Sequence, residues 1–433
     1  MAYNVRVVCR LPSGGNISFV NIRMYEDLII GLQKKRPELS RAQITHWVHN
    51  PNFPYDICDS DREALTEFLE QYLTRNRISR DKLYSSIPFQ PHSANFNFID
   101  LFAGIGGFNL GMHRQGGACV FSSEWDKTAQ ETYFKNYGKF PFGDINYFTA
   151  EEVSDEDINR RIPDHHILCG GFPCQPFSLA GVSARTSRGI AHGFECDTQG
   201  TLFYSIARIA YVKQPEILFL ENVKNIVGHN SGETFRVIRE TLEKLAAGAE
   251  AKHNYVFNYA IVNSQTLVPQ RRERCFMVCI RADVYERLGE YEFPVFDGDS
   301  MPLSSVLEQL SQDEQDEYTI SDKLWQGHIN RTKRNLERKT GFTANLANLN
   351  APSNTIVARY GKDGKECLVP QGDGLNPRKL TKKECARLFG YPENFQFPEA
   401  KTPTYKLLGN SVVVPVVETI SQSIIRYLGY HQT

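Results

Sequence analysis

Short apolar runs alternate with segments of helical apolar spacing between residues 96 and 280. Helices are expected at residues 108–114, 127–137, 202–212 and 233–246. Strands are expected at residues 98–101, 167–168, 217–223 and 275–280, with two more ending at residues 124–126 and 143–145. This alternation predicts an α/β fold with a mostly parallel sheet and right-handed crossovers.

The pattern changes on both sides of this region. Helical apolar spacing at residues 39–48 and 61–73 predicts a small N-terminal unit, either a plain helical domain or a DNA-binding helix-turn-helix. A linker rich in Pro and Ser follows it, and the chain becomes turn-rich and polar beyond residue 280. We therefore expect an accessory unit, an α/β core, an irregular lobe and a final helical segment, at residues 1–90, 96–280, 281–377 and 378–433.

The composition is that of an ordinary intracellular protein. The chain has 433 residues, of which 41% are hydrophobic and 23% charged, enough for two or three domains with a large core. No apolar run approaches the length needed to cross a bilayer, and the N-terminus lacks the apolar core of a signal peptide. The ten cysteines show no CxxC or Cys/His spacing, so we expect neither disulfides nor a bound metal.

Charge is distributed unevenly, although the formal net charge is only -1. Residues 290–317 carry many acidic side chains and no Lys or Arg. The sign then reverses, and the next basic residues are Lys323, Arg331, Lys333, Arg334, Arg338 and Lys339. Either run taken alone is typical of a solvated surface.

Polar or glycine-rich features stand at the ends of three predicted strands. The glycine-rich turn at residues 102–107 precedes a helix, which lets the backbone approach a nucleoside closely. Cys174 follows the strand at 167–168, and Glu221 lies at the end of the next strand. A lone cysteine is usually a buried, inert thiol. Because parallel strands end at one edge of a sheet, the three features together predict a single site with a nucleophilic thiol and an acid.

Other short segments occur in a fixed order around these three. They are Glu124-Trp125-Asp126, Gly143-Asp144-Ile145, Gln270-Arg271-Arg272-Glu273-Arg274, Leu380 to Leu388 and Gly409 to Pro415. The ordered set resembles the DNA (cytosine-5)-methyltransferase family over roughly residues 96–428. The resemblance implies a Rossmann-like S-adenosylmethionine-dependent methyltransferase domain, a target-recognition lobe at 281–377 and a C-terminal segment that packs back on the catalytic sheet.

The resemblance also implies catalytic roles. Cys174 attacks C6 of the target cytosine, which makes C5 nucleophilic enough to accept a methyl group. Glu221 hydrogen-bonds the exocyclic amine and N3 of the ring, and Arg274 makes the surroundings of the thiol electropositive. Arg272 is a further candidate, although an arginine pair after a turn is often only a salt-bridge element.

The cofactor implied by the resemblance is S-adenosyl-L-methionine. Since it carries a sulfonium and no phosphate, the glycine-rich turn does not need the dinucleotide spacing GxGxxG, and it lacks that spacing. Glu124 is expected to bind both ribose hydroxyls, Trp125 to stack on adenine, and Asp144 to accept from its amino group. The whole expected pocket is Phe102, Gly104, Ile105, Gly107, Glu124, Trp125, Asp144, Ile145, Pro173, Leu202, Asn410 and Val412.

Double-stranded DNA is the expected partner, and the target base must be flipped out of the duplex to be reached. Ser183, Arg185 and Arg188 lie in a Gly- and Ser-containing stretch after Cys174 and are candidates to fill the vacated stack or hold phosphate. The segment around Arg359 and Lys362 resembles lobes that read CCGG or CCWGG, and Arg359 is the first candidate for a guanine contact. The basic block from residue 323 lies in the same lobe, which favours phosphate contact.

Two alternatives to this function remain open. One is a tRNA cytosine-5 methylase of the same fold, which the long basic lobe and the N-terminal extension disfavour. The other is a catalytically silent DNA-binding regulator, which the presence of Cys174, Glu221 and Arg274 disfavours. We expect a monomer in the bacterial cytoplasm, associated with the nucleoid through DNA. The sequence gives no indication of a partner restriction endonuclease.

Overall fold

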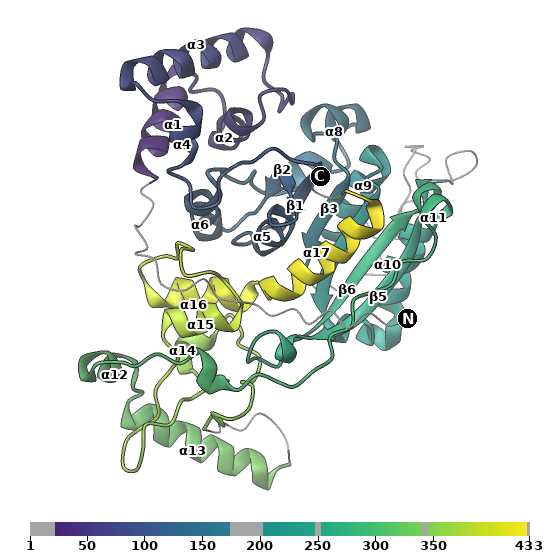
Figure 1. The fold of residues 1–433 in the computed structure, drawn as a ribbon. Coiled ribbons are helices and arrows are strands. Elements are labelled where there is room, and N and C mark those ends of the chain that lie inside the picture. Colours follow the sequence, from purple (N-terminus) through teal and green to yellow (C-terminus); the bar gives the residue numbers. More distant parts are fainter. Residues whose placement is uncertain (1–21, 174–201, 247–252, 340–343, 345, 431–433) are drawn as a thin grey trace.

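The computed structural model describes residues 22–173, 202–246, 253–339, 344 and 346–430 (Figure 1). One six-stranded sheet forms its centre, with the strand order β2-β1-β3-β4-β6-β5. The strands are β1 Phe96–Leu101, β2 Gly117–Ser123, β3 Ile167–Gly171, β4 Ile217–Val223, β5 Tyr255–Asn263 and β6 Glu273–Arg281. The first four are mutually parallel, whereas β6 is antiparallel to both of its neighbours. The predicted α/β fold with a mostly parallel sheet is confirmed.

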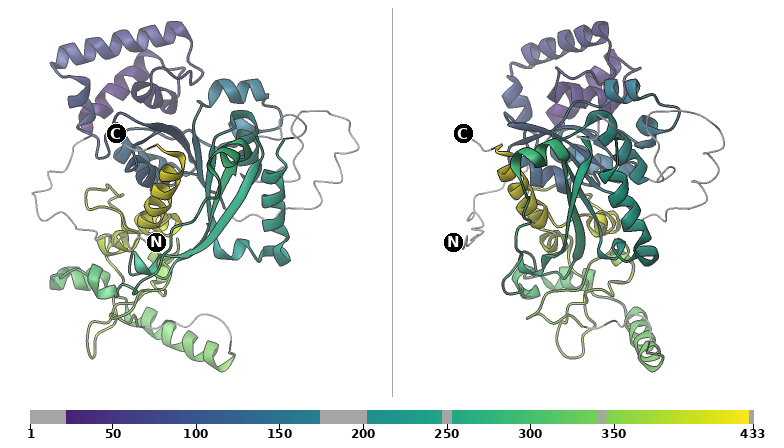
Figure 2. Two further views of the ribbon diagram at one scale, coloured as in Figure 1. Left: turned by 45° about the vertical axis from the view of Figure 1, so that its right-hand side comes forward. Right: turned by 90° about the vertical axis from the view of Figure 1, so that its right-hand side faces the viewer.

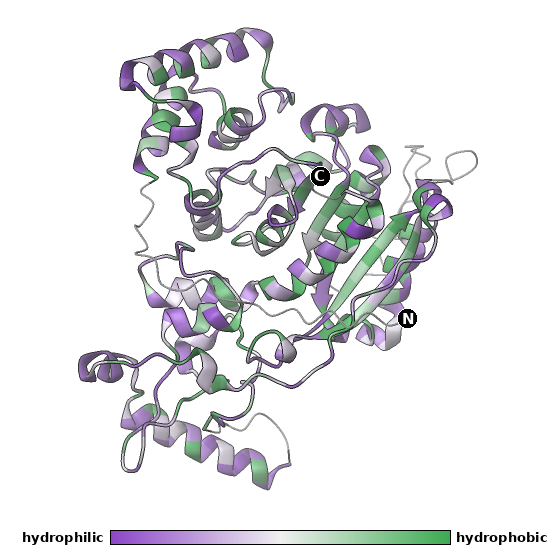
Figure 3. Cartoon of the chain, in the orientation of Figure 1, coloured by the Kyte–Doolittle hydropathy of each residue, from purple (hydrophilic) through white to green (hydrophobic). Residues whose placement is uncertain are grey.

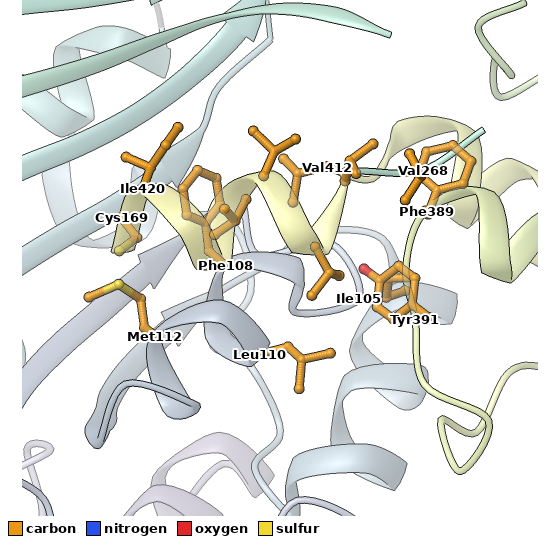
Figure 4. Close-up of a cluster of buried hydrophobic side chains, with 14 of the residues drawn as sticks. Ile105, Phe108, Leu110, Met112, Cys169, Val268, Phe389, Tyr391, Val412 and Ile420 are labelled. Carbon is orange, nitrogen blue, oxygen red and sulfur yellow. The ribbon is translucent and has the colours of Figure 1, made fainter. Parts of the chain in front are cut away.

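Alternate residues of the strands face two separate hydrophobic clusters. Ile99, Leu168 and Leu218 belong to the cluster that contains residues of α9 (Leu202–Lys213) and α10 (Glu233–Glu243). Their neighbours Phe98, Cys169 and Phe219 belong to the other cluster, with α5 (Gly107–His113) and α17 (Val414–Leu428). Figure 4 shows part of this second cluster, in which Phe108 and Met112 of α5 lie beside Ile420 of α17. The C-terminal helix therefore covers one face of the sheet.

The predicted helices at 108–114, 127–137, 202–212 and 233–246 are confirmed, the second as α6 (Lys127–Tyr137). The prediction of a strand that ends at residues 143–145 is wrong. Phe142 makes a single parallel bridge to Ser123, and the chain then turns into the short helix α7 (Asn146–Thr149). The turn forms because the Asp144 carboxylate accepts a hydrogen bond from the Asn146 amide at 3.0 Å. Helix α8 (Asp155–Arg161) follows.

The N-terminal unit is helical, as predicted, and it packs on the β2 edge of the sheet (Figure 1). Its helices are α1 Arg23–Lys35, α2 Arg41–His49, α3 Asp59–Asn76 and α4 Arg80–Tyr84. Their buried residues are continuous with the cluster on one face of the sheet. Residues 22–90 are therefore joined to the α/β core by shared packing as well as by the chain.

The lobe after β6 has little regular structure apart from short helices and one long one. The helices are α11 Ala282–Leu288, α12 Gln312–Tyr318, α13 Asp322–Glu337 and α14 Tyr360–Asp363, and the lobe also contains the 3-10 turn Leu303–Val306. Further 3-10 turns in the described part of the α/β core include Lys224–Ile226, His229–Gly232 and Ser264–Thr266. Helix α13 stands away from the sheet and is coloured mostly hydrophilic (Figures 2 and 3). Only His328 of this helix is buried. Of the predicted basic block, Lys323, Arg331, Lys333 and Arg334 lie on this helix, and Arg338 and Lys339 follow its end.

The C-terminal segment returns to the α/β core through α15 (Lys382–Leu388), α16 (Lys401–Asn410) and α17. The stretch Lys401–Leu428 is long and apolar enough to cross a membrane by length and composition, contrary to the expectation from sequence. The structure divides it at residues 411–413, and 61% of its most apolar window is buried inside the protein. Its apolar residues serve the core that α17 shares with α5.

The contact between α5 and α17 gives a test of this packing. A Cβ at Gly111 would lie 2.7 Å from Val417 Cγ1 and 3.2 Å from the Glu418 amide nitrogen. Gly111→Ala should therefore lower the free energy of unfolding by about 1 to 3 kcal/mol, measured by urea denaturation. Gly327→Ala on α13 is the control, since its Cβ meets nothing within 4 Å. The control should be neutral or stabilising by up to about 1 kcal/mol. Equal stability of the two variants would contradict close packing at Gly111.

Candidate active site

The turn between β1 and α5 has an unusual backbone. Phe102 and Gly104 both have φ near 55°, and Gly106 has φ of 82°. A Cβ at Gly106 would lie 2.3 Å from the Tyr137 ring, so only glycine fits there. A Cβ at Gly104 would meet nothing within 4 Å. The turn is therefore packed against the protein on one side and open at Gly104, with Ile105 buried beneath it.

Glu124 links this turn to the end of β2. Its carboxylate is 8% exposed and accepts hydrogen bonds from the amides of Gly104 and Asp126, each at 2.8 Å. Burial raises the pKa of Glu124, while the two amides oppose that rise. The next side chain, Trp125, is 79% exposed. A buried acid beside an open turn and an exposed aromatic ring is suited to a ligand with hydroxyl groups and a flat base.

The segment after the bridge at Phe142 completes this edge. The Glu124 amide donates to the Phe142 carbonyl at 2.8 Å, which fixes the two chain segments side by side. Asp144 is exposed, and Ile145 is buried. The structure therefore brings together Glu124, Trp125, Asp144 and Ile145 at the end of β2, as the sequence predicts.

The opposite wall comes from the C-terminal segment. A Cβ at Gly107 would lie 2.5 Å from Val412 Cγ2, so Val412 packs directly on the start of α5. Tyr391 shares a hydrogen bond of 2.6 Å with Ser411, which holds this stretch in place. Asn410 is the last residue of α16 and is exposed. Of the two expected cofactor residues of the C-terminal segment, Val412 thus lies beside the glycine-rich turn.

Glu221 and Arg274 form an ion pair across strands β4 and β6. The distance from Arg274 Nε to Glu221 Oε1 is 3.0 Å, and the two side chains are 17% and 11% exposed. Burial raises the pKa of Glu221, and the neighbouring Arg274 and Arg272 counteract this. A Cβ at Gly171, the last residue of β3, would lie 3.4 Å from Glu221 Oε2. The carboxylate therefore lies beside the chain that leads to Cys174.

Asn222, which follows Glu221 on β4, was not predicted from the sequence as a functional residue. Its side-chain amide donates to the Phe172 carbonyl at 2.8 Å and is buried. This bond fixes the backbone two residues before Cys174. Pro173 follows Phe172 and is exposed, and Leu202 is the half-buried first residue of α9. The predicted residues Cys174, Ser183, Arg185 and Arg188 lie outside the described residues.

Arg272 is placed differently from Arg274. Its guanidinium is buried and donates to the carbonyls of Ile356 at 3.0 Å, Gly409 at 3.1 Å and Ser411 at 2.8 Å. The guanidinium carbon also lies 5.1 Å from the Phe389 ring centroid. Burial and the nearby Arg274 lower the pKa of Arg272 to about 9. Its hydrogen bonds go to backbone, which is the geometry of a positioning residue.

Gln270 makes the same kind of connection and was also missed as a functional residue. Its side-chain amide donates to the Leu388 carbonyl at 2.9 Å, and its oxygen accepts from the Ile356 amide at 2.9 Å. The segment Gln270 to Arg272 therefore holds both the lobe and the C-terminal segment against the α/β core. Further along the chain from Ile356, Arg359 directly precedes α14 and Lys362 lies on it. Both side chains are exposed.

No group of three or more His, Cys, Asp or Glu side chains that could hold a metal occurs within the described ranges. The residues that are present suit an adenosine-like ligand with a positive charge, because the open turn at Gly104, the buried Glu124 and the exposed Trp125 adjoin one another. The same edge carries the Glu221–Arg274 pair on neighbouring strands. One edge of the sheet thus carries both the groups that suit a nucleoside and, on neighbouring strands, a buried acid.

Comparison with known proteins gives consistent matches. The family model described as C-5 cytosine-specific DNA methylase matches residues 96–426. The Type II methyltransferase M.SsoII of Shigella sonnei is 43% identical over 350 residues, which cover 80% of this chain and 84% of that protein. A DNA-cytosine methyltransferase of Escherichia coli (strain K12) is 40% identical over 370 residues, covering 77% and 78%. The solved structure of the S. pombe Dnmt2 methyltransferase shares the fold, with a TM-score of 0.54 at 16% identity over 77% of this chain and 99% of that one.

The ion pair on β4 and β6 leads to a pH prediction. Arg274→Met removes a group that lowers the pKa of Glu221 while burial remains, so this pKa should rise further. The Glu221 carboxyl then stays protonated to higher pH, and folding stability should fall as the pH rises through the raised pKa. Infrared titration of the carboxyl band, with Glu221→Gln to identify it, measures the shift. An unchanged or lower pKa would contradict the pairing.

Proposed function

Because the chain belongs to the C-5 cytosine-specific DNA methylase family, we propose that it transfers a methyl group from S-adenosyl-L-methionine to C5 of cytosine within a short double-stranded DNA sequence. The observation that carries the proposal is the Glu221–Arg274 pair beside the end of β3, on the sheet edge where the buried Glu124 carboxylate accepts a hydrogen bond from the open turn at Gly104. The family match and this geometry rest on different evidence and agree.

S-Adenosylmethionine supplies an electrophilic methyl group on its sulfonium when it is bound. In our proposal Glu124 binds the ribose hydroxyls, the exposed ring of Trp125 covers the adenine, and Asp144 accepts from the adenine amino group. Phe102, Gly104, Ile105 and Gly107 form the floor, which the open space at Gly104 supports. The rest of the proposed pocket is Ile145, Pro173, Leu202, Asn410 and Val412.

The chemistry assigned to the chain begins with its thiol. The Cys174 thiolate adds to C6 of cytosine, the electron pair moves to C5, and C5 takes the methyl group. A base then removes the C5 proton, and the thiolate leaves as the ring double bond forms again. Glu221 holds the exocyclic amine and N3 of the base, and Arg274 holds Glu221 by their contact of 3.0 Å. We assign Arg272 the positioning of these elements, because its hydrogen bonds go to carbonyl groups.

DNA binding is assigned to the lobe and to the segment after Cys174. The target cytosine is flipped into the site, and Ser183, Arg185 and Arg188 contact the DNA around the vacated position. Arg359 reads a guanine edge at a short GC-rich site of the CCGG or CCWGG type, with Lys362 nearby. The exposed basic side chains of α13 contact phosphates. The relatives at 40% identity and above favour DNA over tRNA as substrate. We place the enzyme in the bacterial cytoplasm, as a monomer on nucleoid DNA.

Covalent trapping tests the proposed nucleophile. Fluorine at C5 blocks the last elimination, so the wild-type protein with S-adenosylmethionine should form a stable adduct on duplex DNA that carries 5-fluorocytosine. Cys174→Ser should form no adduct and should lose methyl transfer. Cys58→Ser is the matched control, because Cys58 is exposed on the N-terminal unit. It should trap DNA like the wild type. An adduct with Cys174→Ser, detected by denaturing electrophoresis, would refute the assignment.

The lobe should read bases and phosphates through different residues. Arg359→Ala is expected to weaken binding of a duplex that contains the target sequence by about 1 to 3 kcal/mol. It should weaken binding of a scrambled duplex by much less. Lys333→Ala on α13 should weaken both duplexes equally and reduce the dependence of affinity on salt. Competition binding at two salt concentrations separates the two patterns. Equal losses on both duplexes for Arg359→Ala would show that it contacts backbone only.

A further inference from the structure

The N-terminal unit forms a hydrogen bond to a β-bulge in the edge strand β2. The register pairs Phe98 with Cys119 and then Ile99 with Phe121, so Val120 is skipped and forms a bulge. The Tyr55 hydroxyl donates to the Val120 carbonyl at 2.7 Å. Tyr55 and the next residue have φ of 46° and 56°, values that side chains other than glycine rarely adopt. A bulge near a site sets the direction of the strand end, and here a residue from outside the sheet holds it.

His46 makes a second contact with β2, closer to the pocket. One ring nitrogen lies 3.0 Å from the Ala42 carbonyl and the other 3.3 Å from Ser122 Oγ. Burial lowers the pKa of His46 to about 3, so the ring is neutral at physiological pH. Since a carbonyl only accepts, Nδ1 carries the proton and Nε2 accepts from the Ser122 hydroxyl. The ring centroid also lies 4.8 Å from that of Phe142.

These two contacts act on the backbone that carries both proposed cofactor acids. The Phe142 amide donates to the Ser122 carbonyl, and the Glu124 amide donates to the Phe142 carbonyl, each at 2.8 Å. Phe142 stacks on Phe121 at 4.7 Å between ring centroids. Glu124 lies two residues beyond Ser122, and Asp144 lies two residues beyond Phe142. The N-terminal unit therefore holds, from one side, the paired segments that set the spacing of the two acids.

We propose that the N-terminal helical unit, residues 22–90, positions the cofactor pocket and thereby sets the affinity of the enzyme for S-adenosylmethionine. This role rests on the proposed function, because it assumes that Glu124 and Asp144 bind that cofactor. Tyr55 and His46 are the positioning residues. They act on the pocket through the Val120 bulge and through Ser122 and Phe142, and they take no part in the chemistry.

Tyr55→Phe tests the proposal, since it removes only the hydroxyl that holds the bulge. Tyr84→Phe is the matched control, because the Tyr84 hydroxyl donates to the Val48 carbonyl at 2.8 Å within the N-terminal unit itself. Calorimetric titration without DNA should show a dissociation constant for S-adenosylmethionine raised about threefold to tenfold by Tyr55→Phe and unchanged by Tyr84→Phe. DNA affinity measured without cofactor should be the same in both variants and the wild type.

Hydrogen exchange provides a readout that does not need the cofactor. The Glu124 and Phe142 amides should exchange faster in Tyr55→Phe than in Tyr84→Phe, because their mutual bonds are less firmly held. If the wild type fails to bind S-adenosylmethionine, the proposed function falls, and exchange at these amides still decides whether the unit positions them. Equal exchange in the two variants, or equal cofactor affinity, would overturn the proposal. An equal loss of cofactor affinity in both variants would also overturn the proposal, because it would indicate general destabilisation.

Discussion

The buried guanidinium of Arg272 is the contact on which the rest of the site depends. A buried charge is costly unless its donors are satisfied, and here three carbonyl groups accept from the two terminal nitrogens of the guanidinium, whereas its buried Nε has no hydrogen-bond partner among the residues that the structure describes. The three carbonyls belong to Ile356, Gly409 and Ser411, which lie 84, 137 and 139 residues further along the chain. The planar fork of arginine can bond several fixed oxygens at once, which a lysine does less well. One side chain thus joins β6 to the lobe and to the C-terminal segment.

Each of the three carbonyl groups that Arg272 binds lies close in sequence to a residue of the proposed site. Ser411 precedes Val412, which packs on Gly107 at the end of the glycine-rich turn. Ile356 lies three residues before Arg359, the candidate for reading a base. Arg272 directly precedes β6 and lies two residues before Arg274, which pairs with Glu221. The proposed cofactor pocket, the proposed base-reading residue and the proposed catalytic acid are therefore connected through one segment.

Much of this fold could be predicted from the sequence, because hydrophobic periodicity is a local property. The helix at 127–137 was predicted with the bounds that the structure has, and strand ends placed Glu124 and Glu221 at one edge. The strand expected to end at residues 143–145 is absent, because the chain makes only a single bridge at Phe142 and then turns at Asp144. Helix α13 was missed, although Leu324, Trp325, Ile329 and Leu336 recur along it at helical spacing. The partners of Arg272 and Asn222 are backbone carbonyls, which no side-chain pattern reveals. The hydrogen bond from the Tyr55 hydroxyl to the Val120 carbonyl likewise depends on tertiary structure, which the local sequence does not reveal.

Arg272→Lys is the variant that tests the central connection most directly, because it keeps the charge and removes the fork. The measurement is the affinity for S-adenosylmethionine together with the preference for target over scrambled duplex, on one preparation of the variant. Hydrogen bonds to a charged group are worth about 1.5 to 3 kcal/mol, so we predict that both quantities fall together by about tenfold or more. Full cofactor affinity and full sequence preference, with only a lower melting temperature, would show that Arg272 stabilises the fold without connecting the functions.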